Sequence, residues 1–464
     1  IIIQNYSKIL ISTNQTIFFQ SIRANNPTKF AIFAVKSTKA MTAIVGVMNR
    51  HAIAIAADSA VTMGNTHKVV NNGNKLFMLS KYEPVGIATY SNAALMGTPW
   101  EIIIKIYRKQ LGEKHFPHLS DYVIDFIHFL HTHNFFTDDI TQHNWLKNQI
   151  EAFYILNLRI ICQKFNFKNF DYNDPLIIEK LKDELNSCLD ANKINPSICD
   201  DFVGYTFEQF KNETKVDFDE IYQHSQVSNL PIDLRDLFCE AFFYYWIIQL
   251  EPDYHTGLVF CGYGDDDLYP SIIPCVVATG YNKRLKYFIN QAKADSISEH
   301  GTSVTIAPFA QTDVIQTITQ GLTPDCQNII FNTIKNGVDS YTDTLCRYLS
   351  SKPEGKKFAD EISKLDISSI IKTLSQGVLD SMRDSYTRPL LNTIAGLAKE
   401  DLANMAESFI SLTCLIRRMS PSEETVGGPI DVAVISKGDG FIWMNRKHYF
   451  NPELNKHFFN NYYR

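Results

Sequence analysis

Alternating apolar and polar positions predict a β-sheet that begins near residue 43. Residues 43–49 and 51–58 alternate around a short turn, and residues 75–79 and 85–90 continue the sheet. Strand patterns return in the second half of the chain, where a Lys-Gly-Asp-Gly sequence fits a hairpin turn between the last two. These later strands are predicted over residues 257–261, 271–278, 304–306, 430–436 and 441–444.

Apolar residues spaced three and four apart predict helices between the strands. Ser91 or Asn92 is a suitable N-cap for a helix that reaches Leu111, and Ser120 is a suitable N-cap for the next one. That second helix is expected to bury one face, made by Val123, Ile124, Ile127 and Leu130. A helix near the end of the chain has an apolar stripe of Leu402, Met405, Phe409, Leu412 and Ile416.

Two long segments lack strand patterns. The first, at about 135–249, is helical and aromatic in character. The second follows a helix predicted over residues 313–335, spans about 336–398 and opens at the helix breaker Gly337. We interpret both as helical insertions into an α+β domain that covers residues 42–464.

Composition limits the classes of function. The 464 residues are 45% hydrophobic and 12% aromatic, which is enough for one large core or two ordinary ones. A net charge of -6 gives no reason to expect nucleic acid binding, and no apolar run is long enough to cross a membrane. The nine cysteines show no Cys-x-x-Cys spacing and indicate reduced core thiols in a cytoplasmic protein.

Residues 1–41 differ from the rest of the chain. The first 40 contain five Lys or Arg and no Asp or Glu, and their apolar runs are too short for a signal anchor. Three interpretations are open: translated upstream sequence, a propeptide removed by self-cleavage, and a targeting segment. Because Met41 fits an initiator, the first is favoured.

Met41 followed by the small residue Thr42 points to a specific chemistry. If translation starts at Met41, removal of the methionine leaves Thr42 with a free α-amino group beside its own hydroxyl. The amine, with an unperturbed pKa of about 7.7 to 8.0, can take the proton of the hydroxyl and make it a nucleophile. A nearby cation such as Lys75 would favour the neutral amine, and Asp58 could pair with and orient that lysine. Asp58 and Lys75 could instead form a purely structural ion pair.

These residues carry a resemblance. The opening strand from Thr42, the Ala-Ala-Asp58-Ser run, the Asn-Lys75-Leu turn, residues 84–94 and the closing residues 427–435 resemble the proteasome β-subunits and the bacterial proteasome-related peptidases. These are N-terminal-nucleophile hydrolases that use a mature amino-terminal threonine. The resemblance implies a four-layer αββα sandwich, here with two helical insertions.

The same resemblance implies further site residues. Backbone N–H groups at Ser91 and Asn92 would stabilise the oxyanion, and an acid that tunes the threonine would be Glu423 or Glu424. No cofactor is implied. The histidines at 128, 131 and 133 and the acidic run 265–267 invite a metal site, but we prefer a helix end and a hairpin turn, and expect no metal.

The sequence thus predicts a threonine-type hydrolase that cleaves amide or peptide bonds through an acyl-enzyme on Thr42. The alternative is a non-catalytic, proteasome-like structural or binding subunit. The inserted helices could replace the family's ring contacts, so a homo-oligomer and an ATPase partner both stay open. Substrate identity cannot be read from these residues.

Overall fold

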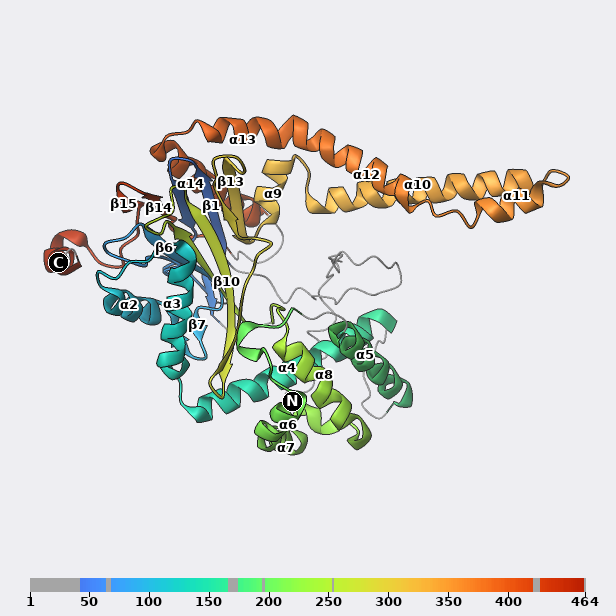
Figure 1. The fold of residues 1–464 in the computed structure, drawn as a ribbon, viewed down its shortest axis with the longest axis horizontal. Coiled ribbons are helices and arrows are strands. Elements are labelled where there is room, and N and C mark those ends of the chain that lie inside the picture. The colour runs from blue at the N-terminus through green and yellow to red at the C-terminus, as the bar shows by residue number, and fades with distance from the viewer. Residues whose placement is uncertain are drawn as a thin grey trace.

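Two antiparallel sheets form the central part of the molecule (Figure 1). The computed structural model describes residues 42–63, 68–165, 174–193, 197–252, 254–419 and 426–462. Residues 1–41 and the predicted acids Glu423 and Glu424 therefore lie outside the described residues. Helices and antiparallel sheets are mixed along the chain, which confirms the predicted α+β class.

The first sheet has five strands in the order β13, β1, β2, β14, β15, and each neighbouring pair is antiparallel. The strands β1 and β2 are adjacent in sequence and in space, whereas β13 and β14 come from the second half of the chain. The bounds are β13 (Val304–Ala310), β1 (Ala43–Asn49), β2 (Ile53–Ala57), β14 (Asp431–Ser436) and β15 (Gly440–Asn445).

The second sheet has six strands in the order β11, β10, β9, β6, β5, with β12 paired to β10. Two short hairpins, β3 with β4 and β7 with β8, lie outside both sheets. The bounds are β11 (Arg284–Ile289), β10 (Ser271–Tyr281), β9 (Thr256–Gly262), β6 (Val85–Ser91), β5 (Leu76–Met78), β12 (Asp295–Ser296), β3 (Val61–Met63), β4 (Lys68–Val70), β7 (Ala94–Leu95) and β8 (Thr98–Pro99).

Both sheets are buried on two faces. Successive side chains of a strand point to opposite faces, so Ile44 of β1 joins an apolar cluster shared with the second sheet, while Val45 joins a cluster on the outer face. That outer face is covered by α14 (Lys399–Met419). The helices α2 (Trp100–Leu111) and α3 (Leu119–Thr132) cover the outer face of the six-stranded sheet.

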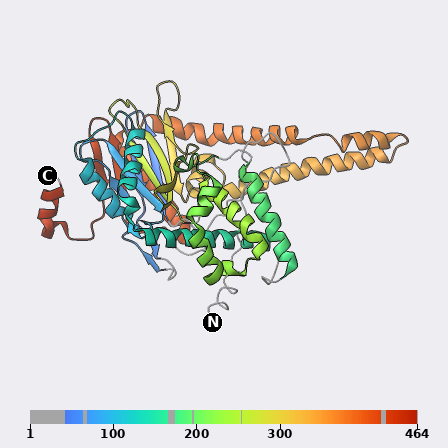
Figure 2. The same ribbon diagram turned by 60° about the horizontal axis from the view of Figure 1, so that its bottom comes forward.

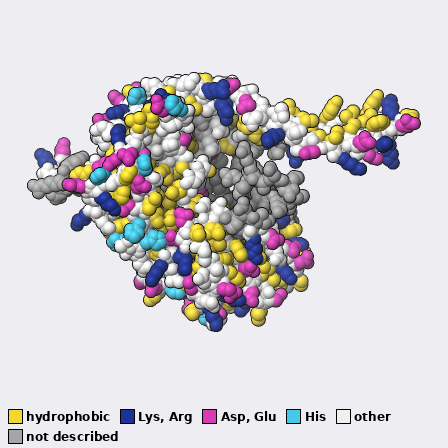
Figure 3. Space-filling view, viewed as in Figure 1, with side chains coloured by type: hydrophobic (Ala, Val, Ile, Leu, Met, Phe, Trp, Pro, Cys, Tyr) yellow, Lys and Arg dark blue, Asp and Glu magenta, His cyan; other side chains and the backbone are white. Residues whose placement is uncertain are grey.

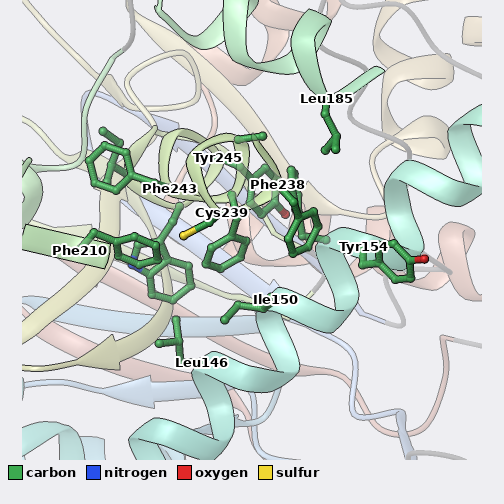
Figure 4. Close-up of a cluster of buried hydrophobic side chains, with 14 of the residues drawn as sticks. Leu146, Ile150, Tyr154, Leu185, Phe210, Phe238, Cys239, Phe243 and Tyr245 are labelled. Carbon is green, nitrogen blue, oxygen red and sulfur yellow. The ribbon is translucent and has the colours of Figure 1, made fainter. Parts of the chain in front are cut away.

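A helical lobe follows α3, and its core also includes side chains of β10 and β11. The longest helix of the lobe, Asp139–Phe165, and its last helix, Arg235–Ile247, pack through aromatic side chains. Figure 4 shows Tyr154 and Phe238 in this cluster, with ring centroids 5.8 Å apart. Its elements are η2 (Asn134–Phe136), α4 (Asp139–Phe165), α5 (Pro175–Lys193), η3 (Asp200–Phe202), α6 (Phe207–Glu213), α7 (Lys215–His224), η4 (Gln226–Asn229), η5 (Ile232–Leu234) and α8 (Arg235–Ile247).

A long helical arm, defined as residues 324–395, projects from the sheets (Figures 1 and 2). It follows α9 (Asp313–Gln320), runs outward along α10 and returns beside it. Its elements are α10 (Pro324–Ser350), α11 (Gly355–Ile362), α12 (Ser368–Met382), the π-helical segment η6 (Arg383–Thr387) and α13 (Arg388–Ala395). After β15 the chain ends in η7 (Pro452–Asn455) and α15 (Lys456–Tyr462).

The predicted helix from Ser91 or Asn92 was wrong in its start. The chain first makes the β7–β8 hairpin, with Met96 and Gly97 at positive φ, and the helix begins at Trp100 after Pro99. A proline is accepted before or within the first helical turn but not in the interior, so this start follows from the sequence once Pro99 is considered. The next helix begins at Leu119, and its Ile124 is exposed rather than buried.

The second insertion was predicted to open at Gly337, and this was also wrong. The helical break lies earlier, at Gly321, whose φ of 75° ends α9, and Thr323 then caps α10 by accepting the Cys326 N–H at 3.0 Å. Gly337 lies inside α10, because one glycine costs an exposed helix only about 1 kcal/mol.

The face that α14 turns to the sheet also differs from the predicted stripe. Leu402 and Phe409 are buried as expected, but Leu412 and Ile416 are exposed. The buried face is completed instead by Ala403, Ala406, Ile410, Thr413 and Cys414.

Candidate active site

The strand register brings the predicted nucleophile and acid together. In the antiparallel pair β1 and β2, Ile44 lies opposite Ala57, so the start of β1 faces the end of β2. Thr42 precedes β1 and Asp58 follows β2 directly. The Asp58 N–H donates to the Ala43 carbonyl at 3.1 Å, which extends the ladder to the edge of the site.

Asp58 is fully buried, and its carboxylate is fully engaged. Oδ1 accepts the Lys75 ammonium at 2.7 Å and the Ala43 N–H at 2.9 Å. Oδ2 accepts the Ala60 N–H at 3.1 Å and the Gly427 N–H at 3.2 Å. These four donors satisfy the buried carboxylate and hold it in one orientation.

Lys75 lies directly before β5 of the other sheet, and its carbonyl accepts the Thr89 N–H at 2.8 Å. Burial lowers the pKa of Lys75 from its ordinary value, Asp58 opposes this by stabilising the ammonium, and the nearby Lys447 adds to the lowering. A buried lysine with a lowered pKa and a specific carboxylate partner is typical of functional sites.

Thr42 directly precedes Ala43, whose backbone N–H donates to Asp58. The Thr42 carbonyl accepts the Gln311 N–H at 3.2 Å, at the point where β13 leaves the sheet, and its neighbour Ala43 pairs with Ala310. Thr42 is 4% exposed in this form of the chain. The structure therefore brings Thr42, Asp58 and Lys75 to one corner of the two sheets.

The closing residues Gly427 to Pro429 wrap around Asp58 and Ser59. Besides the Gly427 N–H on Asp58, the Ser59 N–H donates to the Gly427 carbonyl at 3.1 Å, and the Ser59 hydroxyl donates to the Pro429 carbonyl at 2.5 Å. Gly428 has a φ of 77°, and a Cβ there would lie 2.8 Å from the Asn71 carbonyl oxygen. Only glycine fits this position without strain.

A second buried ion pair, which was not predicted from the sequence, lies beside the first. Asp431 opens β14 opposite Ala57, and its carboxylate accepts the backbone N–H of Lys447 at 2.9 Å as well as the Lys447 ammonium. A carboxylate at the start of an apolar strand needs a partner when it is buried, and this sequence signal could have predicted the pair.

The two predicted oxyanion donors have different surroundings. Ser91 ends β6 opposite Thr256, is exposed and has a φ of 69°. The Asn92 N–H donates to the His255 carbonyl at 3.1 Å, so that donor already has a partner. Of the two, Ser91 is the residue that we retain for this role.

The end of β6 lies over the start of β1. Tyr90, next to Ser91, stacks on Phe309 with ring centroids 6.1 Å apart, and Phe309 pairs with Ile44. Within the described residues, the buried Tyr90 hydroxyl has no hydrogen-bond partner.

The histidines and the acidic hairpin have partners of their own. His131 Nε2 lies 3.1 Å from Asp201, and His133 Nδ1 lies 3.0 Å from the Phe129 carbonyl oxygen. Asp267 accepts the N–H groups of Gly264 and Leu119, at 2.8 and 2.9 Å, and is paired with His118. In the part of the chain that the structure describes, no group of three His, Cys, Asp or Glu side chains is placed to hold a metal ion.

Comparisons with known proteins add no assignment. Neither the protein-family models nor the curated proteins gave a match to this chain. Among the described helices, none combines the length and the apolar character needed to cross a lipid bilayer. The case for a function therefore depends on the geometry around Asp58 and Lys75.

Proposed function

We propose that this chain is a threonine-type N-terminal-nucleophile hydrolase that cleaves amide or peptide bonds through an acyl-enzyme on Thr42. The observation that carries the proposal is the shared oxygen of Asp58, which accepts both the Lys75 ammonium and the N–H of Ala43, the residue after Thr42. A single carboxylate thus fixes the cation and the proposed nucleophile relative to each other.

The reaction needs a free amine on Thr42. The neutral amine takes the hydroxyl proton as Oγ attacks the substrate carbonyl carbon, and the oxyanion forms near the Ser91 backbone. The amine then passes the proton to the leaving nitrogen as the C–N bond breaks, which leaves an ester on Oγ. Water hydrolyses this ester and restores the hydroxyl.

Lys75 and Asp58 would act on the electrostatics of these steps. The positive charge of Lys75 favours the neutral amine and opposes the build-up of negative charge during attack. Asp58 holds the lysine in place, since its remaining lone pairs are bound by backbone N–H groups that do not titrate.

The fold supports the same family. The outer helices α2 and α3, the two stacked sheets and the outer helix α14 correspond in order to the four-layer αββα sandwich of N-terminal-nucleophile hydrolases. The proposed nucleophile would precede the first strand of that sandwich, as Thr42 precedes β1.

A non-catalytic, proteasome-like structural or binding subunit is the alternative. It is favoured by the 4% exposure of Thr42 and by the peptide bond that joins Thr42 to Met41 in this sequence, because an amide nitrogen cannot act as the base. The two functions therefore differ in whether the peptide bond between Met41 and Thr42 is cleaved or intact.

The proposed partner is a peptide or small amide substrate, and no cofactor takes part in the steps above. All nine cysteines are free thiols, which supports the cytoplasmic location that we propose.

The test is the intact mass of the natively expressed protein, combined with an electrophilic inhibitor directed at amino-terminal threonine. A chain that begins at Thr42 and gains one inhibitor mass on Thr42 supports the hydrolase. A chain that keeps Met41 and does not react supports the non-catalytic subunit and contradicts the hydrolase.

A further inference from the structure

The helical arm, residues 324–395, has almost no interior of its own. None of the side chains of α10 or α12 is buried, although α10 alone has 27 residues and so extends about 40 Å. Most of the stability of protein helices comes from packing of an apolar face rather than from helix propensity. A two-helix hairpin with this little buried surface lacks that contribution along most of its length.

Large apolar side chains lie on the open surface of the arm instead. Figure 3 shows hydrophobic side chains along the arm on the face toward the viewer. Six of those on the two long helices are between 36% and 70% exposed: Ile329, Tyr341, Tyr348, Ile370, Leu374 and Leu379.

The spacing in α10 is that of helices that pack lengthwise against each other. Positions 331, 334, 338, 341, 345 and 348 are all apolar and alternate steps of three and four, as in the core positions of coiled coils and helix bundles. Phe331, Val338 and Leu345 are partly covered, whereas Tyr341 and Tyr348 continue the same stripe into solvent. The stripe is therefore wider than the return limb of the arm can cover.

The exposed area is close to what a specific interface needs. Because an aromatic side chain carries roughly 150–250 Å² of surface, the six side chains expose on the order of 600 Å² in each copy. A stable interface takes about 800 Å² from each partner, including its polar rim, so these side chains would supply much of the area that an interface needs.

Charge favours a second copy over a charged partner. The arm has nine Lys or Arg and nine Asp or Glu, so it is neutral, while the whole chain has a net charge of -6. A neutral surface neither repels its own copy nor attracts nucleic acid or an anionic lipid surface. Two copies related by a two-fold axis also present the same apolar stripe to each other.

We propose that the arm packs against the arm of a second copy, so that the two hairpins form a four-helix bundle with Tyr341, Tyr348 and Leu374 in its core. Such a bundle buries the second half of each apolar stripe, which the single hairpin leaves open. This dimer does not depend on the proposed hydrolase activity, because none of the arm residues involved contacts Asp58 or Lys75.

The experiment measures the mass of the full chain in solution by light scattering over a wide range of concentrations. Two variants place a charge in the proposed bundle core, Tyr341→Lys on the α10 stripe and Leu374→Lys on α12. Both positions are exposed and helical, and lysine is a good helix former. Val216→Lys on α7, at a position 65% exposed, is the matched control outside the arm. Far-UV circular dichroism checks that all three variants are folded.

We expect dimers from the parent, the control and the Lys75→Ala variant. For the two arm variants, the dissociation constant of the dimer should be at least about 30-fold higher than for the parent. A parent that stays monomeric overturns the proposal, and so does a dimer that both arm variants retain. Binding of a monomeric parent to neutral lipid vesicles through the arm would assign the stripe to a membrane surface and equally overturn it.

Discussion

Lys75 Nζ lies 2.7 Å from Asp58 Oδ1, and this ion pair joins the two sheets. Asp58 ends the second strand of the five-stranded sheet, and Lys75 precedes the edge strand β5 of the six-stranded sheet. Both side chains are buried, at 0% and 6% exposure. The charge that the proposed mechanism needs is therefore held at a fixed point between the sheets, beside the start of β1.

The first prediction concerns this pair. Lys75→Ala should abolish labelling of Thr42 by a threonine-directed electrophile, because the amine loses the cation that favours its neutral form. The fold should persist, since three backbone N–H groups still bind Asp58, but the free energy of unfolding should fall by about 3 kcal/mol. Labelling rates come from mass spectrometry and stability from urea unfolding.

Asp58→Asn tests the other half of the pair. Because the Lys75 ammonium would lose its carboxylate partner and move, labelling of Thr42 should slow, as we expect for Lys75→Ala. Lys437→Ala, on the β14–β15 turn away from Asp58, is the control and should label like the parent. Parent-like labelling of both site variants would exclude the proposed roles of Asp58 and Lys75.

The second prediction concerns Gly428, which combines a φ of 77° with a close approach to the Asn71 carbonyl. Gly428→Ala should destabilise the protein by about 1 to 3 kcal/mol and should also slow labelling of Thr42, because Gly427 donates to Asp58. Gly438→Ala is the matched control, since a Cβ there has no neighbour within 4 Å and no positive φ to accommodate. Equal melting temperatures for the two variants would contradict the strain argument.

The third prediction concerns a buried lysine outside the site. Lys286 of β11 donates to the carbonyls of Tyr245, Trp246 and Ile248 at 3.1, 2.6 and 2.9 Å and so closes the end of α8. Burial lowers the pKa of Lys286 to about 8, and the neighbouring Cys199 opposes this shift.

Because the folded pKa lies below the ordinary value of 10.5, the unfolded chain binds more protons between pH 8 and 10.5. The free energy of unfolding should therefore rise with pH through that window. The difference between the parent and Lys286→Met should grow in favour of the parent by about 1 kcal/mol from about pH 7.5 to about pH 9. Lys182→Met, at an exposed position of α5, should show no such trend, and a flat difference for Lys286→Met would rule out the low pKa.

The two-sided burial of β1 and β2 explains why the start of the fold was predictable. Their apolar runs, the turn between them and the position of Asp58 after the second strand lie close together in the sequence, so local pattern was sufficient. The pairing of Lys75 with Asp58 was predicted from the chemistry of a cation beside a carboxylate and from the resemblance, because no local pattern shows that residues of two different sheets meet.

Other contacts could not be predicted because they depend on distant segments. Asp431 meets Lys447 and lies opposite Ala57, 374 positions earlier in the chain, and no local pattern encodes that register. Gly337 was predicted to break the helix because it is a glycine. The helix α10 continues through it, since one glycine weakens a helix without ending it. The true break is at Gly321, which has a left-handed conformation and lies so near Tyr386, 65 positions later, that an added Cβ would be 2.6 Å from its ring.

The last prediction concerns the proposed base. The activity of the enzyme that begins at Thr42 should fall as pH drops through the pKa of the Thr42 amine, because protonation removes the proton acceptor. The charge on Lys75 should place that pKa below the unperturbed value of about 7.7 to 8.0.

In a Lys75→Arg variant the charge is kept but moved, so the rate should fall while an acidic limb remains in the profile. Acetylation of the Thr42 amine leaves the hydroxyl but removes the base, and turnover should be lost. The measurement is the pH profile of kcat/KM for the free and the acetylated enzyme on a peptide amide substrate, and equal activity of the two forms would exclude the amine as the base.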